Sequence, residues 1–257
     1  MLKASISYKE KIYNYNPQKP IDISIPIREG EENVNCYYAE TVKSEIIRMG
    51  NFVGSVAEGG TVNYRKVTIT PHGNGTHTEC YAHISTDKIT VNEALEQFLF
   101  FTQLISITPK ELGNGDFVVC FEDFENQIDK DNLPQAIIIR TLPNLAEKIN
   151  SQYSGSNPPY LDSKIGVFLQ ENNIEHLLVD LPSVDKEVDG GKLLTHKSFW
   201  NYPKSPRAKA TITELIYVPS ETLDGFYLLN LQIISLQLDA SPSKPILYTL
   251  LETAKKD

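Results

Sequence analysis

Three histidines and one glutamate fall within a stretch of twelve residues, between positions 72 and 83. If the chain is extended here, its period of two places His77, Glu79, Tyr81 and His83 on one face. An imidazole and a carboxylate two positions apart can both reach one divalent cation, and the segment Gly73-Asn74-Gly75 allows a tight turn beside it. We therefore expect a metal ion at His77 and Glu79, with His83 near the ion without having to bind it. The spacing leaves open the alternative of a polar loop with solvated histidines.

Two distant residues extend this hypothesis. Glu214 is the one charged residue on the even-numbered face of a predicted strand at 211–218, and a buried carboxylate needs a cation or a hydrogen-bond donor. The alternative is that this face meets solvent at the end of a sheet. His196 follows a Gly190-Gly191 loop and precedes aromatic residues, so it is either a ligand or a packed, hydrogen-bonded histidine. His176 begins an apolar strand and is interpreted as structural.

A cysteine nucleophile is the weaker interpretation of the same segment. Cys80 adjoins Glu79 and therefore points away from the His77 face in an extended strand. No lysine or arginine lies nearby in sequence to lower the pKa of its thiol. We expect Cys80 to be a small packed residue.

Patterns elsewhere in the chain predict the elements that position these groups. The segment 161–172 is amphipathic and leads into an apolar strand, as in a βαβ unit, and Thr90 and Glu93 have capping-box spacing. We expect one mixed α/β domain over residues 1–257. Strands are predicted at 21–27, 67–70, 117–121, 135–140, 176–181, 211–218, 227–238 and 246–250, and helices at 90–101, 145–152 and 161–172.

Composition excludes several partners. The net charge of -9 repels nucleic acid and anionic membranes, and no lysine or arginine cluster offsets it. Three cysteines with no paired spacing argue against a disulfide framework. The N-terminus lacks the apolar core of a signal peptide, and the longest apolar stretch is too short to span a bilayer. We expect a cytoplasmic protein with a small-molecule substrate, no nucleic acid partner and no membrane contact.

Several motifs together resemble one family. The segment Gly75-Thr76-His77-x-Glu79, followed by His83, resembles the His-x-Gly-Thr-His-x-Asp-x-Pro-x-His signature of the metal-dependent cyclases, which include bacterial kynurenine formamidases and isatin hydrolase. The resemblance covers about residues 20–240 and keeps the family's order. Supporting stretches are Asp22-Ile23-Ser24-Ile25-Pro26-Ile27, Ile137-Ile138-Ile139-Arg140-Thr141, Val179-Asp180-Leu181-Pro182-Ser183-Val184-Asp185, Leu193-Leu194-x-His196 and Glu214-Leu215.

The resemblance implies a compact swivelling β/β/α domain with a mixed sheet, assembled as a homodimer or homotetramer. It implies that His77, Glu79, His196 and Glu214 are metal ligands, and that His83 is the general base or acid. Tyr81 replaces the proline of the signature and would enter the substrate pocket or close it. Independently of the resemblance, the aromatic Trp200 after His196 could line a substrate pocket, form an oligomer contact or pack in the core.

The sequence departs from the signature at its first histidine. That position is Gly73 here, and His72 lies one residue upstream, where it could bind metal only if the loop shifts by about one residue. Glu79 replaces an aspartate, which moves its oxygens by roughly one ångström.

The resulting hypothesis is metal-assisted hydrolysis of a small amide, lactam or ester. Imidazole and carboxylate ligands suit Zn²⁺ or Mn²⁺. Such an ion lowers the pKa of bound water from about 15.7 towards about 7 and polarises a carbonyl. His83 would take the proton of the water and return it to the leaving group. The alternative is a protein of the same fold that binds metal or a small ligand without catalysis.

Overall fold

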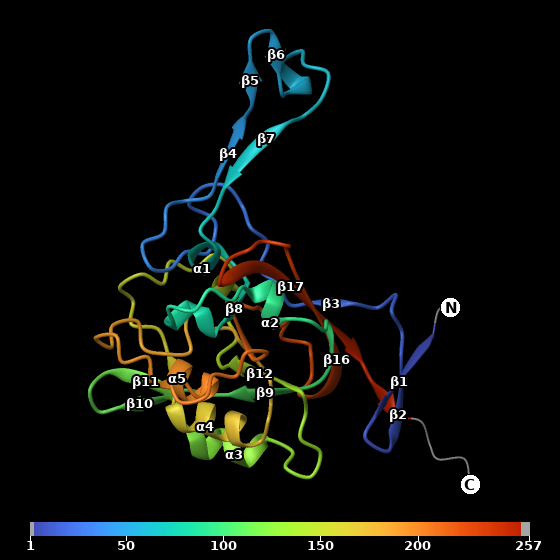
Figure 1. The fold of residues 1–257 in the computed structure, drawn as a ribbon, viewed down its shortest axis with the longest axis vertical. Helices are drawn as coiled ribbons and strands as arrows, with labels where there is room; N and C mark the ends of the chain where they lie inside the picture. Colours follow the sequence, from blue (N-terminus) through green and yellow to red (C-terminus); the bar gives the residue numbers. More distant parts are fainter. Residues whose placement is uncertain (1–2, 253–257) are drawn as a thin grey trace.

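A β-sheet that closes on itself forms the centre of the molecule (Figure 1). The computed structural model describes residues 3–252. Neighbouring strands from β9 to β15 run parallel, whereas the remaining neighbours in the ring are antiparallel. The ring follows the order β16 (Gly225–Ile233), β9 (Leu99–Ile107), β12 (Ala136–Thr141), β14 (His176–Val179), β15 (Thr211–Glu214), β8 (His77–Cys80) and β17 (Ala240–Thr249), and β17 pairs with β16. The short strand β3 (Ile21–Asp22) pairs with β17.

Helices lie outside this ring. Three of them, α3 (Phe121–Gln127), α4 (Ser163–Glu171) and α5 (Leu194–Trp200), gather on one side (Figure 1). Asp162 caps α4, since its side chain accepts a hydrogen bond from the Lys164 amide. The shorter helical elements are α1 (Pro71–Asn74), α2 (Val91–Ala94), η1 (Val56–Glu58), η2 (Tyr81–Ile84) and η3 (Ala146–Ile149). A small sheet of β10 (Lys110–Leu112), β11 (Asp116–Val119) and β13 (Tyr160–Leu161) lies on the same side of the molecule as α5 (Figure 1).

Strand β12 shows why the parallel part of the ring is apolar on both faces. Ile138 packs with Leu104 and Leu178 in one buried cluster. Its neighbours Ile137 and Ile139 belong to a second cluster, which also holds residues of α4 and α5. Alternate side chains of one strand therefore fill the ring and support the helices, which explains the continuous apolar run at 136–139.

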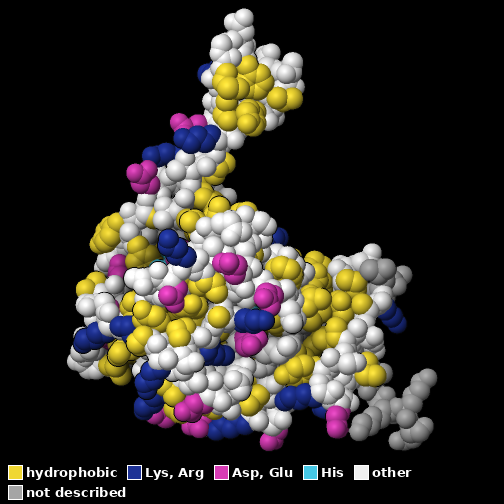
Figure 2. Space-filling model, in the orientation of Figure 1, with side chains coloured by type: hydrophobic (Ala, Val, Ile, Leu, Met, Phe, Trp, Pro, Cys, Tyr) yellow, Lys and Arg dark blue, Asp and Glu magenta, His cyan; other side chains and the backbone are white. Residues whose placement is uncertain are grey.

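A narrow β-ribbon over residues 43–68 projects from the body (Figure 1). Its strands are β4 (Lys43–Ile46), β5 (Arg48–Met49), β6 (Phe52–Val53) and β7 (Arg65–Thr68). Hydrophobic side chains gather at its tip (Figure 2), where Met49, Val56, Val62 and Tyr64 are more than half exposed. We call this segment the arm. Near the chain ends, β1 (Ala4–Tyr8), β2 (Lys11–Tyr15) and β18 (Leu251–Glu252) form another small sheet.

The mixed α/β fold and the amphipathic helix at 161–172 are confirmed, whereas the helix expected at 90–101 is wrong beyond its first turn. The capping box of Thr90 and Glu93 forms, but α2 ends at Ala94. The apolar run that follows becomes β9, because it can pair with β12 and β16 and be buried on both faces. No helix within residues 3–252 is long and apolar enough to cross a membrane.

Two further predictions differ from the structure. In the segment 145–152, where a helix was expected, the structure has the short turn η3. The strand expected at 211–218 ends at Glu214, because Leu215 adopts a left-handed backbone conformation with φ 54°. The helix α5 and the arm were not predicted.

Candidate metal centre

Strands β8 and β15 place His77, Glu79 and Glu214 on one face of the ring. In their antiparallel register His77 lies opposite Glu214. The intervening Thr78 and Thr213 face the other way, where their hydroxyls are 2.8 Å apart. The carboxylate of Glu214 is therefore presented to His77 by the sheet itself, with the alternation that the sequence predicts for both strands up to this point.

The imidazole of His77 is held so that one nitrogen faces Glu214. Its Nδ1 lies 3.0 Å from the Gly75 carbonyl, so it donates a hydrogen bond there. The Nε2 atom then faces Glu214 Oε2, 3.4 Å away. The other oxygen of Glu214 accepts a hydrogen bond of 2.9 Å from the Val184 amide. A backbone contact thus orients each side chain, as is usual for metal ligands.

His196 enters the same centre from α5. Its Nε2 lies 3.2 Å from Glu79 Oε1 and 3.9 Å from Glu214 Oε1. Its Nδ1 lies 2.6 Å from Asp185 Oδ2, and Asp185 also accepts hydrogen bonds from the amides of Thr195 and His196. Asp185 belongs to the stretch Val179–Asp185 that supports the family resemblance. In the structure it orients the His196 ring, the arrangement seen for carboxylate–histidine–metal triads.

A second group of side chains borders the centre on the solvent side. His72 Nε2 lies 3.6 Å from Glu79 Oε2 and 3.2 Å from Asp239 Oδ2. His83 Nδ1 lies 3.6 Å and 3.3 Å from the same two oxygens. These three side chains are 27–33% exposed, whereas those of His77, Glu79, His196 and Glu214 are at most 4% exposed. Asp239 was missed by sequence reasoning, because an aspartate in a loop carries no motif.

His83 reaches the centre by a route other than the predicted one. Strand β8 ends at Cys80, and Tyr81–Ile84 form the 3₁₀ turn η2. An extended chain through His83 is therefore wrong, and the turn brings His83 back towards Glu79. The same turn takes Tyr81 out of the expected alternation, and its ring packs against the buried cluster that holds residues of α4 and α5.

Helix α1 explains the departure at Gly73. A Cβ at this position would lie 2.4 Å from the Ala39 Cβ and 3.1 Å from the Cys36 carbonyl, so no histidine fits there. The helical turn Pro71–Asn74 instead directs the His72 ring into the centre, 5.3 Å from the ring of His77. No shift of the loop is needed.

The remaining candidates lie outside the centre. Trp200 is completely buried, donates a hydrogen bond to the Ala210 carbonyl and packs beside the His196 ring at 5.4 Å. Cys80 is completely buried, and burial raises the pKa of its thiol to about 11. His176 hydrogen-bonds Thr211 and packs on Phe100, and burial lowers its pKa to about 3, as expected for a structural histidine.

The atoms that face one another in the centre fit a bound cation. Among the described residues, His72 Nε2, His77 Nε2 and Glu79 Oε2 are buried polar atoms without a hydrogen-bond partner. Four ligand atoms placed tetrahedrally at about 2.1 Å from an ion stand about 3.4 Å apart. Most distances between neighbouring imidazole nitrogens and carboxylate oxygens here are 3.2–3.6 Å. The three atoms without a partner face their neighbours without bonding to them, as cation ligands do, whereas His196 Nε2 and Glu79 Oε1 are within hydrogen-bond distance of each other at 3.2 Å.

The charges of the buried side chains also favour a bound cation. Burial by itself raises the pKa of Glu79 and lowers that of His196. The imidazoles of His83 and His196 outweigh burial and bring the pKa of Glu79 to about 2. Hydrogen bonds with Asp185 and Glu79 raise the pKa of His196 to about 10. Protons on the imidazoles thus balance the carboxylates when no cation does so, and a divalent ion can replace them.

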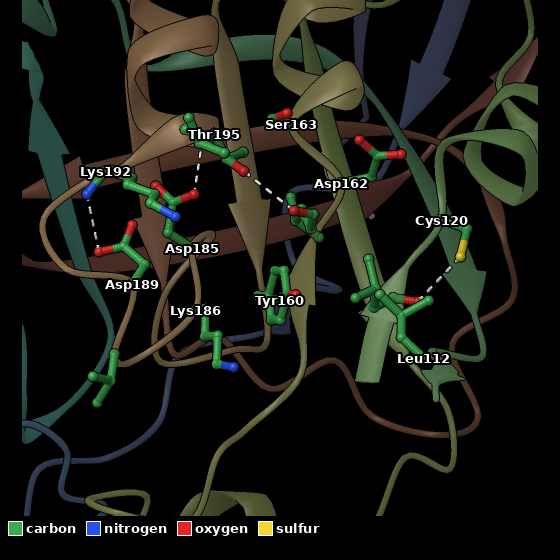
Figure 3. A pocket seen from close by; sticks show the side chains of 14 residues that line it. Leu112, Cys120, Tyr160, Asp162, Ser163, Asp185, Lys186, Asp189, Lys192 and Thr195 are labelled. Carbon is green, nitrogen blue, oxygen red and sulfur yellow. Dashed lines mark hydrogen bonds between the residues drawn. The ribbon is translucent and has the colours of Figure 1, made fainter. Parts of the chain in front are cut away.

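Two cavities lie near the centre. One of about 500 Å³ is lined by Asp185 and Thr195, which are hydrogen-bonded to each other (Figure 3). It lies behind His196, because Asp185 holds the ring nitrogen that faces away from Glu79. The other, of about 270 Å³, is lined by Ala82, Asp87 and Asp239, and it adjoins the solvent-facing side of the centre.

Comparison with known proteins identifies the family. The cyclase family model (Putative cyclase) matches residues 21–186, more than half of the chain. The chain belongs to the cyclase family. No curated protein gave a match.

Solved structures share the fold of this cyclase-family chain. Isatin hydrolase A from Labrenzia aggregata is 13% identical, with 90% of this chain and 93% of the other covered and a TM-score of 0.64. Isatin hydrolase A from Ralstonia solanacearum is 10% identical, with 90% and 92% covered and a TM-score of 0.65. A potential metal-dependent hydrolase with cyclase activity is 16% identical, with 90% and 97% covered and a TM-score of 0.62. At sequence identities of 10–16%, this similarity shows a shared fold and nothing more.

Proposed function

We propose that this cyclase-family chain is a metal-dependent hydrolase of small amides, lactams or esters. The observation that carries the proposal is the convergence of His77, Glu79, His196 and Glu214, whose facing nitrogen and oxygen atoms are 3.2–3.9 Å apart in a buried centre. The structural neighbours that are described as hydrolases support the same activity.

These four residues, with His72, are the proposed ligands. Mixed imidazole and carboxylate ligands suit Zn²⁺ or Mn²⁺. When bound, such an ion supplies an acidified water and polarises a substrate carbonyl. Asp185 keeps the His196 ring oriented, and the Gly75 carbonyl does the same for His77.

His83 is the proposed general base and acid. It is 32% exposed and stands beside the buried Oε2 of Glu79 and the partly exposed carboxylate of Asp239, so it can meet both water and substrate. Its pKa is raised, chiefly by the Glu79 carboxylate, which helps it to hold the proton that it takes from water. It would then return this proton to the leaving nitrogen or oxygen.

The substrate side of the centre is proposed to be the cavity at Ala82, Asp87 and Asp239. Tyr81 directly precedes Ala82, which lines this cavity, and its hydroxyl is a proposed substrate contact. The buried position of Trp200 does not favour contact with substrate. We propose that its ring supports His196 instead.

A panel assay tests this function. Protein loaded with Zn²⁺ or Mn²⁺ is incubated with N-aryl formamides, cyclic aryl amides and simple aryl esters, and the acid product is measured by chromatography. We expect turnover of at least one class. His83→Ala should reduce turnover at least a hundredfold while leaving the metal content unchanged.

The alternative is a metal- or small-ligand-binding protein without catalysis. One observation favours it: His72, His83, Asp239 and Glu79 surround the outer part of the centre, and a coordination sphere closed by side chains leaves no place for water. Stoichiometric metal binding without turnover of any substrate in the panel would support this alternative.

We also propose a homodimer or homotetramer in the cytoplasm. The arm exposes Met49, Val56 and Tyr64 far from the body of its own chain, and a second copy would bury them. All three cysteines are unpaired, which suits a reducing compartment.

A further inference from the structure

The buried carboxylate of Asp180 lies at the point where the pairing of two strands ends. The last paired residues of β12 and β14 are Ile139 and Val179. One residue later, the Asp180 carboxylate accepts hydrogen bonds from the Thr141 amide, at 2.9 Å and 3.1 Å, and from the Thr141 hydroxyl, at 2.9 Å. The side chain thus receives an amide that a backbone carbonyl of a continuing strand would receive. The main chain after Asp180 is therefore free to turn away from β12.

The ammonium of Lys148 compensates this carboxylate. Lys148 belongs to η3, between β12 and β13, and its Nζ lies 2.7 Å from Asp180 Oδ2. It also donates to the Thr141 carbonyl at 2.7 Å. The side chains of Asp180 and Lys148 are 0% and 14% exposed, so removal of either charge would leave the other buried alone. Backbone pairing over residues 136–139 already joins β12 to β14, so the ion pair is not required to hold these strands together.

The loop that follows Asp180 carries the contacts that orient two of the proposed ligands. Its residues 181–185 are all buried. Val184 donates its amide to Glu214 Oε1 at 2.9 Å, and the Asp185 carboxylate holds His196 Nδ1 at 2.6 Å. The place of this one loop relative to the sheet therefore affects both ligands, although they come from β15 and α5.

We propose that Asp180 and Lys148 are positioning residues of the centre. Their ion pair fixes the start of the loop 181–185, and the loop orients Glu214 and His196 through Val184 and Asp185. The effect on ion binding rests on the proposed metal-dependent function, whereas the order of the loop can be measured without any ion.

Amide exchange in the metal-free full chain tests the loop alone. Lys148→Met removes the ammonium, and Asp180→Asn removes the charge of the carboxylate but keeps an oxygen for the Thr141 amide. Hydrogen–deuterium exchange followed by mass spectrometry should show exchange at Val184 accelerated by about tenfold or more, relative to the β12 amides at 136–139, in both variants. An unchanged ratio would overturn the inference, whatever the protein binds.

The affinity for Zn²⁺ connects the loop to the ligands. Competition with a chromophoric chelator should give a Kd raised by about tenfold or more in each single variant, because the contacts to Glu214 and His196 loosen. The double variant buries no unpaired charge, so it should stay folded even where a single variant does not. Its Kd should lie closer to the wild-type value, and its Val184 should still exchange faster than in the wild type, since the loop has lost its charged anchor.

A neighbouring ion pair supplies the matched control. Asp224→Asn weakens the pair with Arg140, which belongs to the same strand β12 but holds the segment 219–224. This variant should lower the urea midpoint and leave the Kd within about twofold of the wild type. Single variants of Asp180 and Lys148 with the same behaviour would show a purely structural pair and overturn the inference. A wild type that binds no Zn²⁺ would overturn the proposed function, and exchange at Val184 would still decide whether the pair fixes the loop.

Discussion

His77 lies directly opposite Glu214 across β8 and β15, with 3.4 Å between its Nε2 and the Glu214 Oε2. The relationship depends on strand register, because a slip of one residue would turn either side chain to the opposite face, where Thr78 meets Thr213. The buried side of the centre therefore depends on the backbone pairing of these two strands.

Asp185→Asn should weaken metal binding without abolishing it. The substitution removes the charge that faces His196 Nδ1 at 2.6 Å, while His196 itself remains. Loss of such a supporting group typically raises the Kd of a metal by about 10–100-fold. Competition with a chromophoric chelator measures this change. Asp131→Asn, in an exposed loop, is the control and should bind like the wild type. Equal affinity of both variants would show that Asp185 does not orient a ligand.

Gly73→Ala should destabilise the protein and disturb His72. The added methyl group would lie 2.4 Å from the Ala39 Cβ, so α1 must move. Overpacking of this kind costs about 1–3 kcal/mol. Urea unfolding measures the loss of stability, and Gly113→Ala, where a Cβ meets open space, serves as the control. Identical midpoints for the two variants would contradict the packing argument for Gly73.

The metal-free protein should lose stability as the pH rises from about 6.5 to about 10. The pKa of His196 is raised from 6.5 to about 10 in the folded chain, so its contribution is complete below 6.5 and is lost through that range. Glu79 has a lowered pKa of about 2, so its contribution is present above about 4.5 and is lost as the pH falls towards 2.

Melting temperatures of the metal-free wild type and His196→Gln, measured from pH 5 to 10, check this expectation. The difference between the two should shrink as the pH rises. Bound metal should act in the opposite sense, because ligand imidazoles must be neutral, so its stabilisation grows with pH. If the difference in melting temperature between the two proteins does not depend on pH, a protonated His196 does not stabilise the metal-free protein.

The arm should control assembly. Replacing both Met49 and Val56 by glutamate places charge on its apolar tip, and we expect the oligomer to dissociate to a monomer. Light scattering after size-exclusion chromatography measures the mass. Leu223→Glu, at another exposed apolar position, should leave the mass unchanged. A double variant with the wild-type mass would exclude the arm from the interface.

The hydrophobic pattern of single segments predicted much of the secondary structure, but it did not predict that the sheet closes into a ring. The run at 136–139 and the amphipathic segment at 161–172 have strong local signals and became β12 and α4. The segment after Ala94 was misread, because its β structure comes from pairing with β12 and β16, which are distant in sequence. The arm went unnoticed, since its short strands are stabilised only by each other.

The buried half of the centre was easier to anticipate than the outer half. His77 and Glu79 share a face through strand alternation, and a carboxylate among apolar residues singled out Glu214. The position of His83 depends on the end of β8 at Cys80 and the turn η2 that follows. The spacing of residues in the sequence does not reveal where a strand ends. Asp239 reaches the centre only because β17 pairs with β8, a contact that a single sequence does not reveal.

Metal content tests the central claim most directly. Wild type, His77→Ala, Glu214→Gln and the control His176→Gln are purified alike, and Zn and Mn are measured by mass spectrometry together with melting temperatures before and after chelation. We predict stoichiometric metal in the wild type and in His176→Gln, a lower melting temperature after its removal, and loss of most metal in His77→Ala and Glu214→Gln. The account would be contradicted by a wild type that contains no metal and whose melting temperature is changed neither by the chelator nor by added ions.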